Sequence, residues 1–402
     1  KATGKNKNII NVKKENSAGM YGSNDSNITN EKTINVSHEN SAGMYASDSN
    51  ATNTADGTIT LTGSAGATSG SAAMYGKLTS SSKKDYSILN EGIINLTNVI
   101  KNVGIYGESI SGAPKKLTLQ NNKEINIANG SPQSVGIFAL NDSNNNVDKI
   151  EVINSSDGVI TVNSEESIGI SAVKSTVNNS GTITMNDKKS AGIYISDSDV
   201  VNNADKTITV EKSESAGIYG KFKNDKNHTI TNNGTITLTT SSSEKESAGI
   251  YGELESGATK ALTVTNSADS AINVGMKESV GIYAKNSSSN GKEKLTVVNS
   301  GTIVTSKEKS VGIFGKKATV INNKTIEVNG QESIGIFGKS GSEIKNVSTD
   351  EGIKVVGENS TGMYATDSGT TGENTGKIVL SGKKSTGMGA ADSAVITNKN
   401  EI

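Results

Sequence analysis

Twelve aromatic side chains recur in one context, directly after a Gly-Ile, Gly-Met or Ala-Met pair in a Ser-x-Gly-type motif. A row of exposed rings could stack on the faces of sugars and so form a carbohydrate-binding surface. Alternatively, rings from neighbouring repeats stack on one another and stabilise the fold by about 0.5–1.5 kcal/mol per pair. Recurrence in nearly every repeat favours this structural ladder. Its members are Tyr21, Tyr45, Tyr75, Tyr106, Phe138, Tyr194, Tyr219, Tyr251, Tyr283, Phe314, Phe337 and Tyr364.

The acidic residues give little support for catalysis. Enzymes that cleave glycans need a pair of positioned carboxylates, or a basic residue beside acidic metal ligands. Here the acidic residues are scattered through turns, as at Glu165, Glu166 and Asp187, and no pair recurs on one face of neighbouring repeats. We therefore predict that the protein is not an enzyme and uses no cofactor. A polysaccharide-cleaving β-helix enzyme is kept as a further alternative.

Metal and thiol chemistry are poorly supported as well. The chain has no Cys and only two His, His38 and His228, which lie far apart in the sequence. The lack of Cys excludes disulfides and thiolate zinc sites. Asp-Ser pairs follow the aromatic position at 47–50, 196–199 and 366–369. We interpret these pairs as Asx turns rather than as calcium ligands.

The charge balance argues against nucleic acid as a partner. All 40 basic residues are Lys, and the net charge is −1. Phosphate clamps normally use Arg, and binding to nucleic acid needs a net basic face. Hydrophobic residues make up only 32% of the chain, a proportion that would suggest disorder if the sequence carried no repeat.

The repeat occurs 14 times, at spacings of 23 to 33 residues. An Asn-x-Gly-Thr-Ile-x-Val motif precedes each aromatic motif, and a looser run of β-branched residues precedes that Asn. Each repeat thus holds three short alternating segments bounded by Gly, Asn and Ser, which is typical of strands. A propeller or sandwich is the alternative, but 23 residues are too few for a propeller blade of about 40. We predict an all-β fold: a single-stranded right-handed parallel β-helix (β-solenoid) with three short strands per coil and about 14 coils.

This architecture predicts which side chains face the core. In GTITM we expect Ile183 and Met185 to point inward and the threonines outward. In the following SAGIY we expect Gly192 and Tyr194 to point outward or to occupy a corner. An Asn before each Gly-Thr-Ile strand would form a ladder of amide hydrogen bonds between coils. Its predicted members are Asn53, Asn90, Asn154, Asn179, Asn203, Asn233, Asn266, Asn299 and Asn323.

Six long repeats gain most of their extra residues directly after the aromatic position. These insertions are 76–86, 107–116 and 139–149, then 220–228, 252–260 and 284–294. Loops that vary within a repeat are often the binding surface, although surface loops also lengthen by drift at little cost. Because the insertions form two sets of three, we predict that they contact a partner. The candidate residues are Lys83, Lys84, Asp85, Lys115, Lys116, Asn141, Asp142, Asn145, Lys223, Asp225, Lys226, Glu253, Glu255, Asn290 and Lys292.

The repeated SAGIYG, SVGIFG and NNGTITL segments resemble the passenger regions of large autotransporter adhesins from fusobacteria and their relatives. The resemblance covers the whole chain and also favours the right-handed coil. It implies a surface-exposed β-helix, exported through a C-terminal outer-membrane barrel by type V secretion. It further implies adhesion to other bacteria, host glycans or host receptors, but it assigns no functional residue.

From these observations we expect residues 1–402 to form one continuous β-helix segment of a longer passenger. The predicted function is that of a non-enzymatic cell-surface adhesin whose scaffold presents edge loops. The expected partner is a host cell-surface receptor or glycan, or a partner bacterium, with the protein a monomeric rod. The expected location is the bacterial cell surface or the secreted fraction. A passive stalk that extends a distal binding domain is the alternative.

Overall fold

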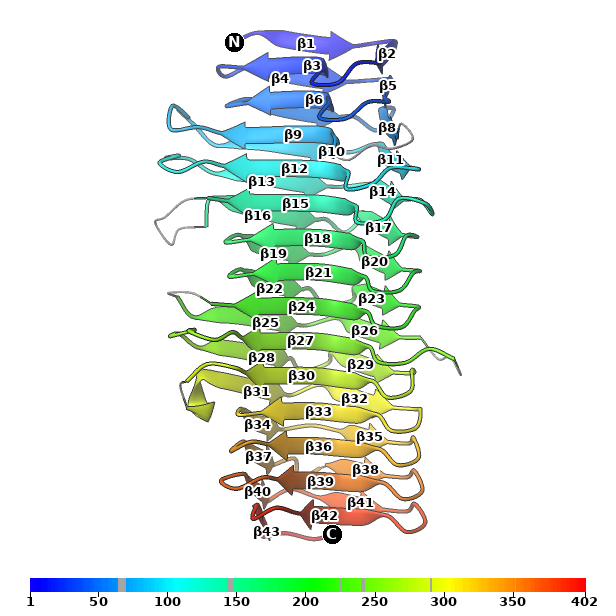
Figure 1. Cartoon of the computed structure of the whole chain (residues 1–402), viewed down its shortest axis with the longest axis vertical. Helices are drawn as coiled ribbons and strands as arrows, with labels where there is room; N and C mark the ends of the chain where they lie inside the picture. The colour runs from blue at the N-terminus through cyan, green and yellow to red at the C-terminus, as the bar shows by residue number, and fades with distance from the viewer. Residues whose placement is uncertain (64–69, 143–147, 224–225, 240–242, 290, 351) are drawn as a thin grey trace. The chain divides into compact units, whose positions relative to one another are not determined.

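The computed structural model describes residues 1–63, 70–142, 148–223, 226–239, 243–289, 291–350 and 352–402. The chain forms two compact units, which we name the N-terminal unit (Lys1–Asp199) and the C-terminal unit (Val200–Ile402). Within each unit every coil supplies one strand to each of three sheets, and each strand pairs in parallel with its equivalent in the next coil (Figure 1). The predicted all-β, right-handed parallel β-helix with three strands per coil is therefore confirmed. One continuous segment over residues 1–402 stays a prediction.

In the N-terminal unit, β1 to β21 form seven coils. The first sheet consists of β1 (Thr3–Asn6), β4 (Asn27–Asn30), β7 (Asn50–Asn53), β10 (Tyr86–Asn90), β13 (Leu117–Asn121), β16 (Ile150–Asn154) and β19 (Thr176–Asn179). The second consists of β2 (Ile9–Val12), β5 (Thr33–Val36), β8 (Thr58–Thr62), β11 (Ile93–Thr97), β14 (Glu124–Ile127), β17 (Val159–Val162) and β20 (Thr182–Met185). The third consists of β3 (Ala18–Ser23), β6 (Ala42–Ser47), β9 (Ala72–Leu78), β12 (Val103–Ser109), β15 (Val135–Asn141), β18 (Ile168–Val173) and β21 (Ala191–Ser196).

The C-terminal unit repeats this plan from β22, which starts at the boundary between the units. Its first sheet consists of β22 (Asp199–Asn202), β25 (His228–Asn232), β28 (Leu262–Asn266), β31 (Leu295–Asn299), β34 (Thr319–Asn322), β37 (Glu343–Asn346), β40 (Thr371–Asn374) and β43 (Val395–Asn398). The second consists of β23 (Thr207–Val210), β26 (Thr235–Leu238), β29 (Ala271–Val274), β32 (Thr302–Thr305), β35 (Ile326–Val328), β38 (Ile353–Val355) and β41 (Ile378–Leu380). The third consists of β24 (Ala216–Phe222), β27 (Ala248–Leu254), β30 (Val280–Asn286), β33 (Val311–Lys316), β36 (Ile334–Lys339), β39 (Thr361–Thr366) and β42 (Thr386–Ala390).

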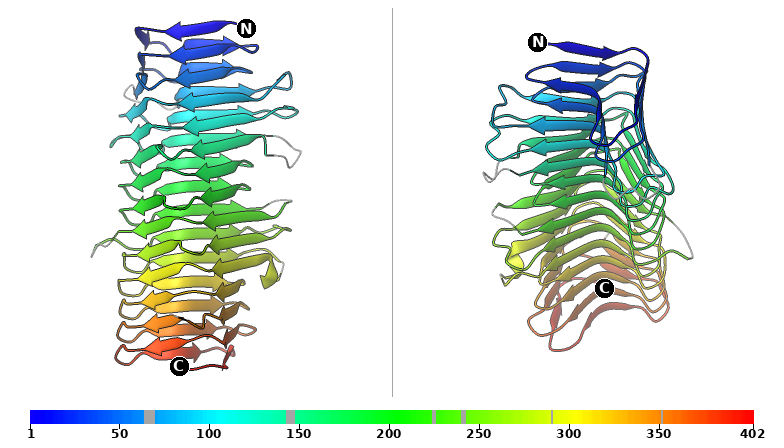
Figure 2. Two further views of the ribbon diagram at one scale, coloured as in Figure 1. Left: turned by 180° about the vertical axis from the view of Figure 1, so that it is seen from behind. Right: turned by 45° about the horizontal axis from the view of Figure 1, so that its top comes forward.

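Helical structure is minimal in the described residues, where it is confined to the 3₁₀ helix η1 (Lys292–Lys294). No helix in the described ranges has the length and apolar character needed to cross a membrane. The tilted view in Figure 2 shows the three sheets of each unit arranged around a thin core. A thin core needs apolar side chains only at inward positions, which explains how a chain poor in hydrophobic residues can fold.

The alternation of side chains follows the prediction in most positions. Ile183 and Met185 are fully buried, whereas Thr182 is exposed and Thr184 is partly exposed. Gly192, however, is buried rather than directed outward. The equivalent Gly169 shows why, since a Cβ atom there would lie 2.5 Å from the carbonyl oxygen of Gly192 and 3.0 Å from Cγ2 of Ile183. The third strand therefore approaches the second sheet so closely at this column that a side chain would clash.

A ladder of buried asparagines runs along the inner end of the first sheet in each unit. The side-chain amide of Asn30 donates to Oδ1 of Asn53 at 2.8 Å, and that of Asn53 donates to Asn90 at 2.8 Å. Three predicted members are wrong by one residue: Asn203, Asn233 and Asn323 lie outside the core. Their places are taken by Asn202, Asn232 and Asn322, each fully buried. These asparagines share the inward face with Val200, Ile230 and Val320, two residues earlier.

The six insertions are partly strand rather than loop. In the six long coils the third strand has seven residues and ends on a buried side chain, as at Leu78 of β9 and Phe222 of β24. The next first-sheet strand also begins on a buried residue, such as Tyr86 or Leu262. The inserted residues therefore widen the coil, and some of them, such as Leu78 and Phe222, add apolar side chains to its interior.

Candidate functional site

The aromatic side chains of the N-terminal unit form a column on the outer face of the third sheet. In-register parallel pairing places Tyr21, Tyr45, Tyr75, Tyr106 and Phe138 above one another. Their ring centroids are separated in turn by 5.4, 4.7, 4.8 and 5.3 Å. Such separations are those of offset contacts, which leave part of each ring at the surface. Tyr21, at the first position, is 63% exposed.

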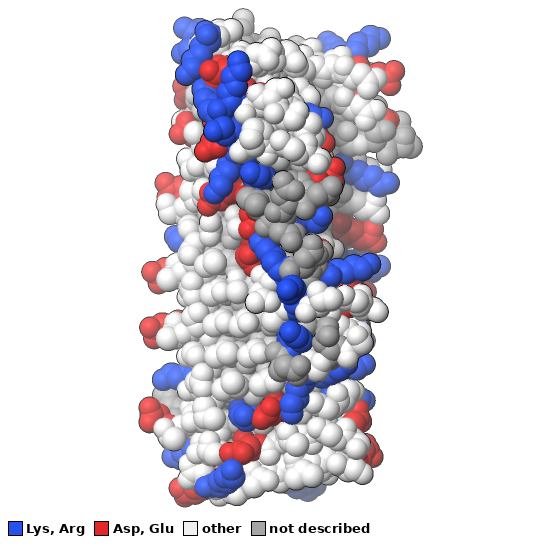
Figure 3. Space-filling model, turned by 90° about the vertical axis from the view of Figure 1, so that its left-hand side faces the viewer, with Lys and Arg blue, Asp and Glu red and all other residues white. Residues whose placement is uncertain are grey.

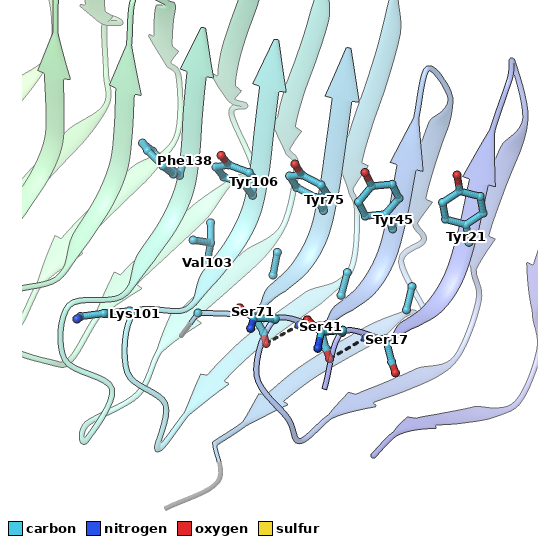
Figure 4. Close-up of a pocket in the computed structure, with 16 residues that line it drawn as sticks. Ser17, Tyr21, Ser41, Tyr45, Ser71, Tyr75, Lys101, Val103, Tyr106 and Phe138 are labelled. Carbon is cyan, nitrogen blue, oxygen red and sulfur yellow. Dashed lines mark hydrogen bonds between the residues drawn. The ribbon is translucent and has the colours of Figure 1, made fainter. Parts of the chain in front are cut away.

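A groove of about 670 Å³ lies along one side of this column (Figure 4). Its floor is the first residue of the third strand in successive coils: Ala18, Ala42, Ala72 and Val103. The floor is low because three consecutive coils carry alanine where later coils carry Val135 and Ile168. The hollow therefore results from side-chain size at one position of the repeat.

The far rim of the groove is formed by the turn before each third strand. Asn16, Asn40 and Lys101 occupy this turn with φ of 54°, 50° and 58°, and all three are exposed. The following serines hold the turns together, since the backbone N–H of Ser17 donates to Oγ of Ser41 at 3.2 Å (Figure 4). The rim thus offers two amides and one ammonium group on a rigid backbone.

Glu108 anchors the opposite side of the column. It accepts a hydrogen bond from the hydroxyl of Tyr75 and lies 3.5 Å from Nζ of Lys77. Burial, and then the charge of Glu108, raise the pKa of Tyr106 to about 12. Burial and the same carboxylate also raise the pKa of Tyr75 well above its usual range. Both phenols therefore remain protonated hydrogen-bond donors near neutral pH.

The column is interrupted inside the N-terminal unit. In the parallel register Ser171 lies opposite Phe138 on one side and Tyr194 on the other. The ladder is therefore interrupted at this coil, because the segment SIGIS carries serine where the two neighbouring coils carry a ring.

The C-terminal unit carries six consecutive rings. Tyr219, Tyr251, Tyr283 and Phe314 are stacked, with centroid separations of 4.5, 4.9 and 4.7 Å. The contacts from Phe314 to Phe337 and on to Tyr364 are edge-to-face, at interplanar angles of 88° and 65°. Here the third-strand floor beside the rings is alanine in the first two coils and rises to Val280, Val311 and Ile334 in the next three.

The sequence of this β-helix matches a known family model over nearly its whole length. The model for the BigA third pectate lyase-like domain matches residues 1–82, 78–260 and 258–401. The chain belongs to this family. The BigA-type domain is a β-helical part of a bacterial surface protein. Searches of the curated proteins and of the solved structures found no match. The finer resemblance to fusobacterial autotransporters stays a prediction.

In this BigA-type domain, the residues predicted to contact a partner fall into three groups. The exposed ones are Lys83, Asp85, Lys116, Asp142 and Lys223, and the partly exposed ones are Lys84, Lys115, Lys226, Glu255 and Lys292. Asn145, Asp225 and Asn290 lie outside the described residues. Asn141 and Glu253 are buried.

The two buried residues have internal partners. The amide of Asn141 donates to the carbonyl oxygen of Lys174 at 2.8 Å. Glu253 is 8% exposed and accepts hydrogen bonds from Lys285 at 2.7 Å, Ser287 at 2.8 Å and Tyr251 at 2.9 Å. Burial alone would raise the pKa of Glu253, but these bonds hold it below its usual range. Both side chains therefore support the widened coils rather than the outer loop surface.

The BigA-type domain shows little that could hold a metal. Over the described ranges, no group of three or more His, Cys, Asp or Glu side chains is placed to bind an ion. The groove was not predicted from the sequence. Its signal is the run of alanines at the first third-strand position, together with asparagine in the preceding turn.

Proposed function

We propose that this chain is a non-enzymatic segment of a bacterial cell-surface adhesin, and that its N-terminal groove binds a neutral glycan on a host cell or a partner bacterium. The observation that carries the proposal is the groove of about 670 Å³ beside the offset column of tyrosines. Membership of a family of surface-protein domains supports the location.

The chemistry of the groove favours a neutral sugar chain. Part-exposed tyrosine rings supply apolar faces for sugar C–H groups, and protonated phenols supply hydrogen bonds. Asn16 and Asn40 on the far rim add amide groups that match sugar hydroxyls. Five coils at about 4.8 Å each would accommodate several linked sugars along the groove.

The lining supports a binding role over a catalytic one. The described lining of the groove contains Lys101 as its one charged residue and includes no carboxylate. Glycoside hydrolysis by the common mechanism needs two carboxyl groups across the scissile bond. The nearby Glu108 is already engaged by Tyr75 and Lys77.

Filling the groove tests the proposal. The full chain is labelled and applied to an array of neutral and acidic glycans, and the strongest neutral glycan is then titrated by calorimetry. Ala42→Ile combined with Ala72→Ile raises the floor, and Ile168 shows that the third sheet tolerates isoleucine at this position. We expect at least about tenfold weaker binding.

The matched control is Ala248→Ile, the same change in the C-terminal unit, which we expect to bind like the wild type. If the groove-filling variant kept its full affinity, the result would contradict a role for the groove in glycan binding. Failure of the wild type to bind any neutral glycan or cell would favour the passive stalk.

A further inference from the structure

The edge that joins the third sheet to the first differs in charge between the two units. In the C-terminal unit the first five connections, 220–228, 252–260, 284–294, 315–318 and 338–342, hold ten lysines and four acidic residues. In the N-terminal unit the connections 22–26, 46–49, 76–86, 107–116, 139–149, 172–175 and 195–198 hold seven lysines and seven acidic residues. Figure 3 shows blue side chains following one another along part of this edge.

The register of the third sheet lines up part of this charge. Lys285, Lys316 and Lys339 occupy equivalent positions in consecutive coils. Glu253, one coil before Lys285, pairs with it at 2.7 Å. In the described part of the chain, neither Lys316 nor Lys339 forms an ion pair. The column thus ends in two cations in adjacent coils that no acidic side chain neutralises.

The lysine column lies beside the aromatic column. Each lysine follows a ring by two residues on the same strand, so both point to the outer face. Phe314 precedes Lys316, and Phe337 precedes Lys339. At the first such position, Nζ of Lys221 lies 5.6 Å from the ring centroid of Tyr219. Cations and apolar ring surface therefore alternate across a narrow strip that continues from coil to coil.

This arrangement works against stability. Like charges directly opposite each other in a sheet are destabilising, and coils are about 4.8 Å apart. The N-terminal unit avoids the problem, since the equivalent positions of its first coils are Ser23 and Ser47, and Lys77 pairs with Glu108. The fold therefore does not require lysine here, and a bound anion would relieve the repulsion.

We infer that the strip formed by Lys285, Lys316 and Lys339 with Phe314 and Phe337 binds a linear acidic polysaccharide, carboxylated or sulfated, laid along the coils. The ammonium groups pair with successive acidic groups, and the rings receive the apolar faces of the sugars. The strip lies in the C-terminal unit and acts independently of the N-terminal groove. Neighbouring rings favour a flexible sugar chain over duplex nucleic acid, and the absence of Arg removes the usual bidentate phosphate contacts.

Calorimetric titration of the full chain with dextran sulfate, polygalacturonate and neutral dextran tests the inference. We expect binding to at least one acidic polymer, weakening as salt increases, and no salt-dependent binding to dextran. Lys316→Ser combined with Lys339→Ser is expected to weaken binding about 30-fold at low salt. The same variant without ligand is expected to unfold at a higher temperature, because the repulsion is gone.

Two controls establish whether binding depends on this strip or on net charge alone. Lys13→Ser combined with Lys14→Ser makes the same change in net charge at exposed positions of the N-terminal unit and is expected to bind like the wild type. The groove-filling variant Ala42→Ile/Ala72→Ile is also expected to retain dextran sulfate binding, whether or not it still binds the neutral glycan. Equal loss in both lysine double variants, or duplex DNA binding as tightly as dextran sulfate, would overturn the assignment.

Discussion

At the first position of the third strand, the N-terminal unit carries alanine from Ala18 to Ala72, whereas the C-terminal unit carries larger residues from Val280 to Ile334. The preceding turn changes as well. Asparagine forms the rim at Asn40, while the C-terminal unit places charged residues there, as at Glu278 and Lys309. The groove of the first unit therefore has an alanine floor and a rim whose one charged residue is Lys101. In the second unit, the coils from β30 to β36 have a raised floor and a charged rim.

The residue two positions after each ring, on the other side of the ring column, also differs between the units. Ser23 and Ser47 flank the rings in the N-terminal unit, whereas Lys316 and Lys339 flank them in the C-terminal unit. These differences lie at outward positions of the third strand and in the turn before it. The inward positions stay alike because each coil must match its neighbours in the core. The comparison teaches that this fold fixes its interior by stacking and leaves its outer columns free to acquire different ligands.

The largest expected effect tests whether the two interiors are equivalent. Ile137 and Ile282 occupy the same third-strand position and are fully buried. Ile137→Ala and Ile282→Ala are each expected to reduce the free energy of unfolding by about 2–5 kcal/mol through the cavity left behind. Urea denaturation of both variants measures it. A loss of stability in only one of the two variants would contradict the conclusion that the two interiors are equivalent.

A somewhat smaller effect distinguishes the asparagine ladder from the surface beside it. Asn322 donates to Asn346 at 2.9 Å and accepts from Asn299 at 2.7 Å, whereas Asn323 is exposed. Asn322→Ala leaves both partners unsatisfied and is expected to cost about 1–3 kcal/mol. Asn323→Ala is the matched control and is expected to cost less than about 0.5 kcal/mol. Similar losses of stability in the two variants would contradict the assignment of Asn322 to the ladder.

The buried carboxylate of the C-terminal edge gives a prediction about pH. Because the folded pKa of Glu253 is lowered, its hydrogen bonds stabilise the protein above the ordinary pKa of about 4.3. That stabilisation is lost as the pH falls through the folded pKa. Glu253→Gln is expected to cost about 1.5 kcal/mol at pH 7, and less at about pH 4, because part of the carboxylate's stabilisation is lost below the ordinary pKa. Thermal unfolding at both pH values measures this, and a constant difference from wild type would contradict it.

The last prediction is a gain of stability in the N-terminal unit. Ser171→Tyr would place a ring between Phe138 and Tyr194. Offset stacking is expected to add about 0.5–1.5 kcal/mol per ring pair to the free energy of unfolding. Ser171→Ala is the control without a ring. An unchanged urea midpoint in the tyrosine variant would show that the column contributes no clamping energy.

Much of the fold follows from the sequence because inward and outward positions alternate strictly within each repeat. Ile183 and Met185 were assigned to the core on that basis and lie there. In three Asn-Asn pairs the prediction chose the wrong asparagine, because two identical neighbouring residues do not themselves show which one faces inward. In the first pair, the inward face is the one that carries Val200. That face is set by the strand register, as Asn202 shows.

The sites were harder to predict than the fold. The insertions read as loops, yet Leu78 and Phe222 continue the alternation and are buried. The groove depends on the depth of an alanine floor relative to a turn several residues earlier in the chain. The alanines form a floor only because the register stacks them at one position in successive coils.

Because the coils stack in register, one whole coil could be removed without disturbing the pairing of the others. Residues 155–179 comprise one complete coil, from just after Asn154 to the equivalent Asn179. Removing them would leave every remaining strand with an equivalent neighbour and would bring Phe138 next to Tyr194. The coil is thus the unit by which such a chain can grow or shrink through recombination, and a surface column can be lengthened, broken or repaired without redesigning the interior.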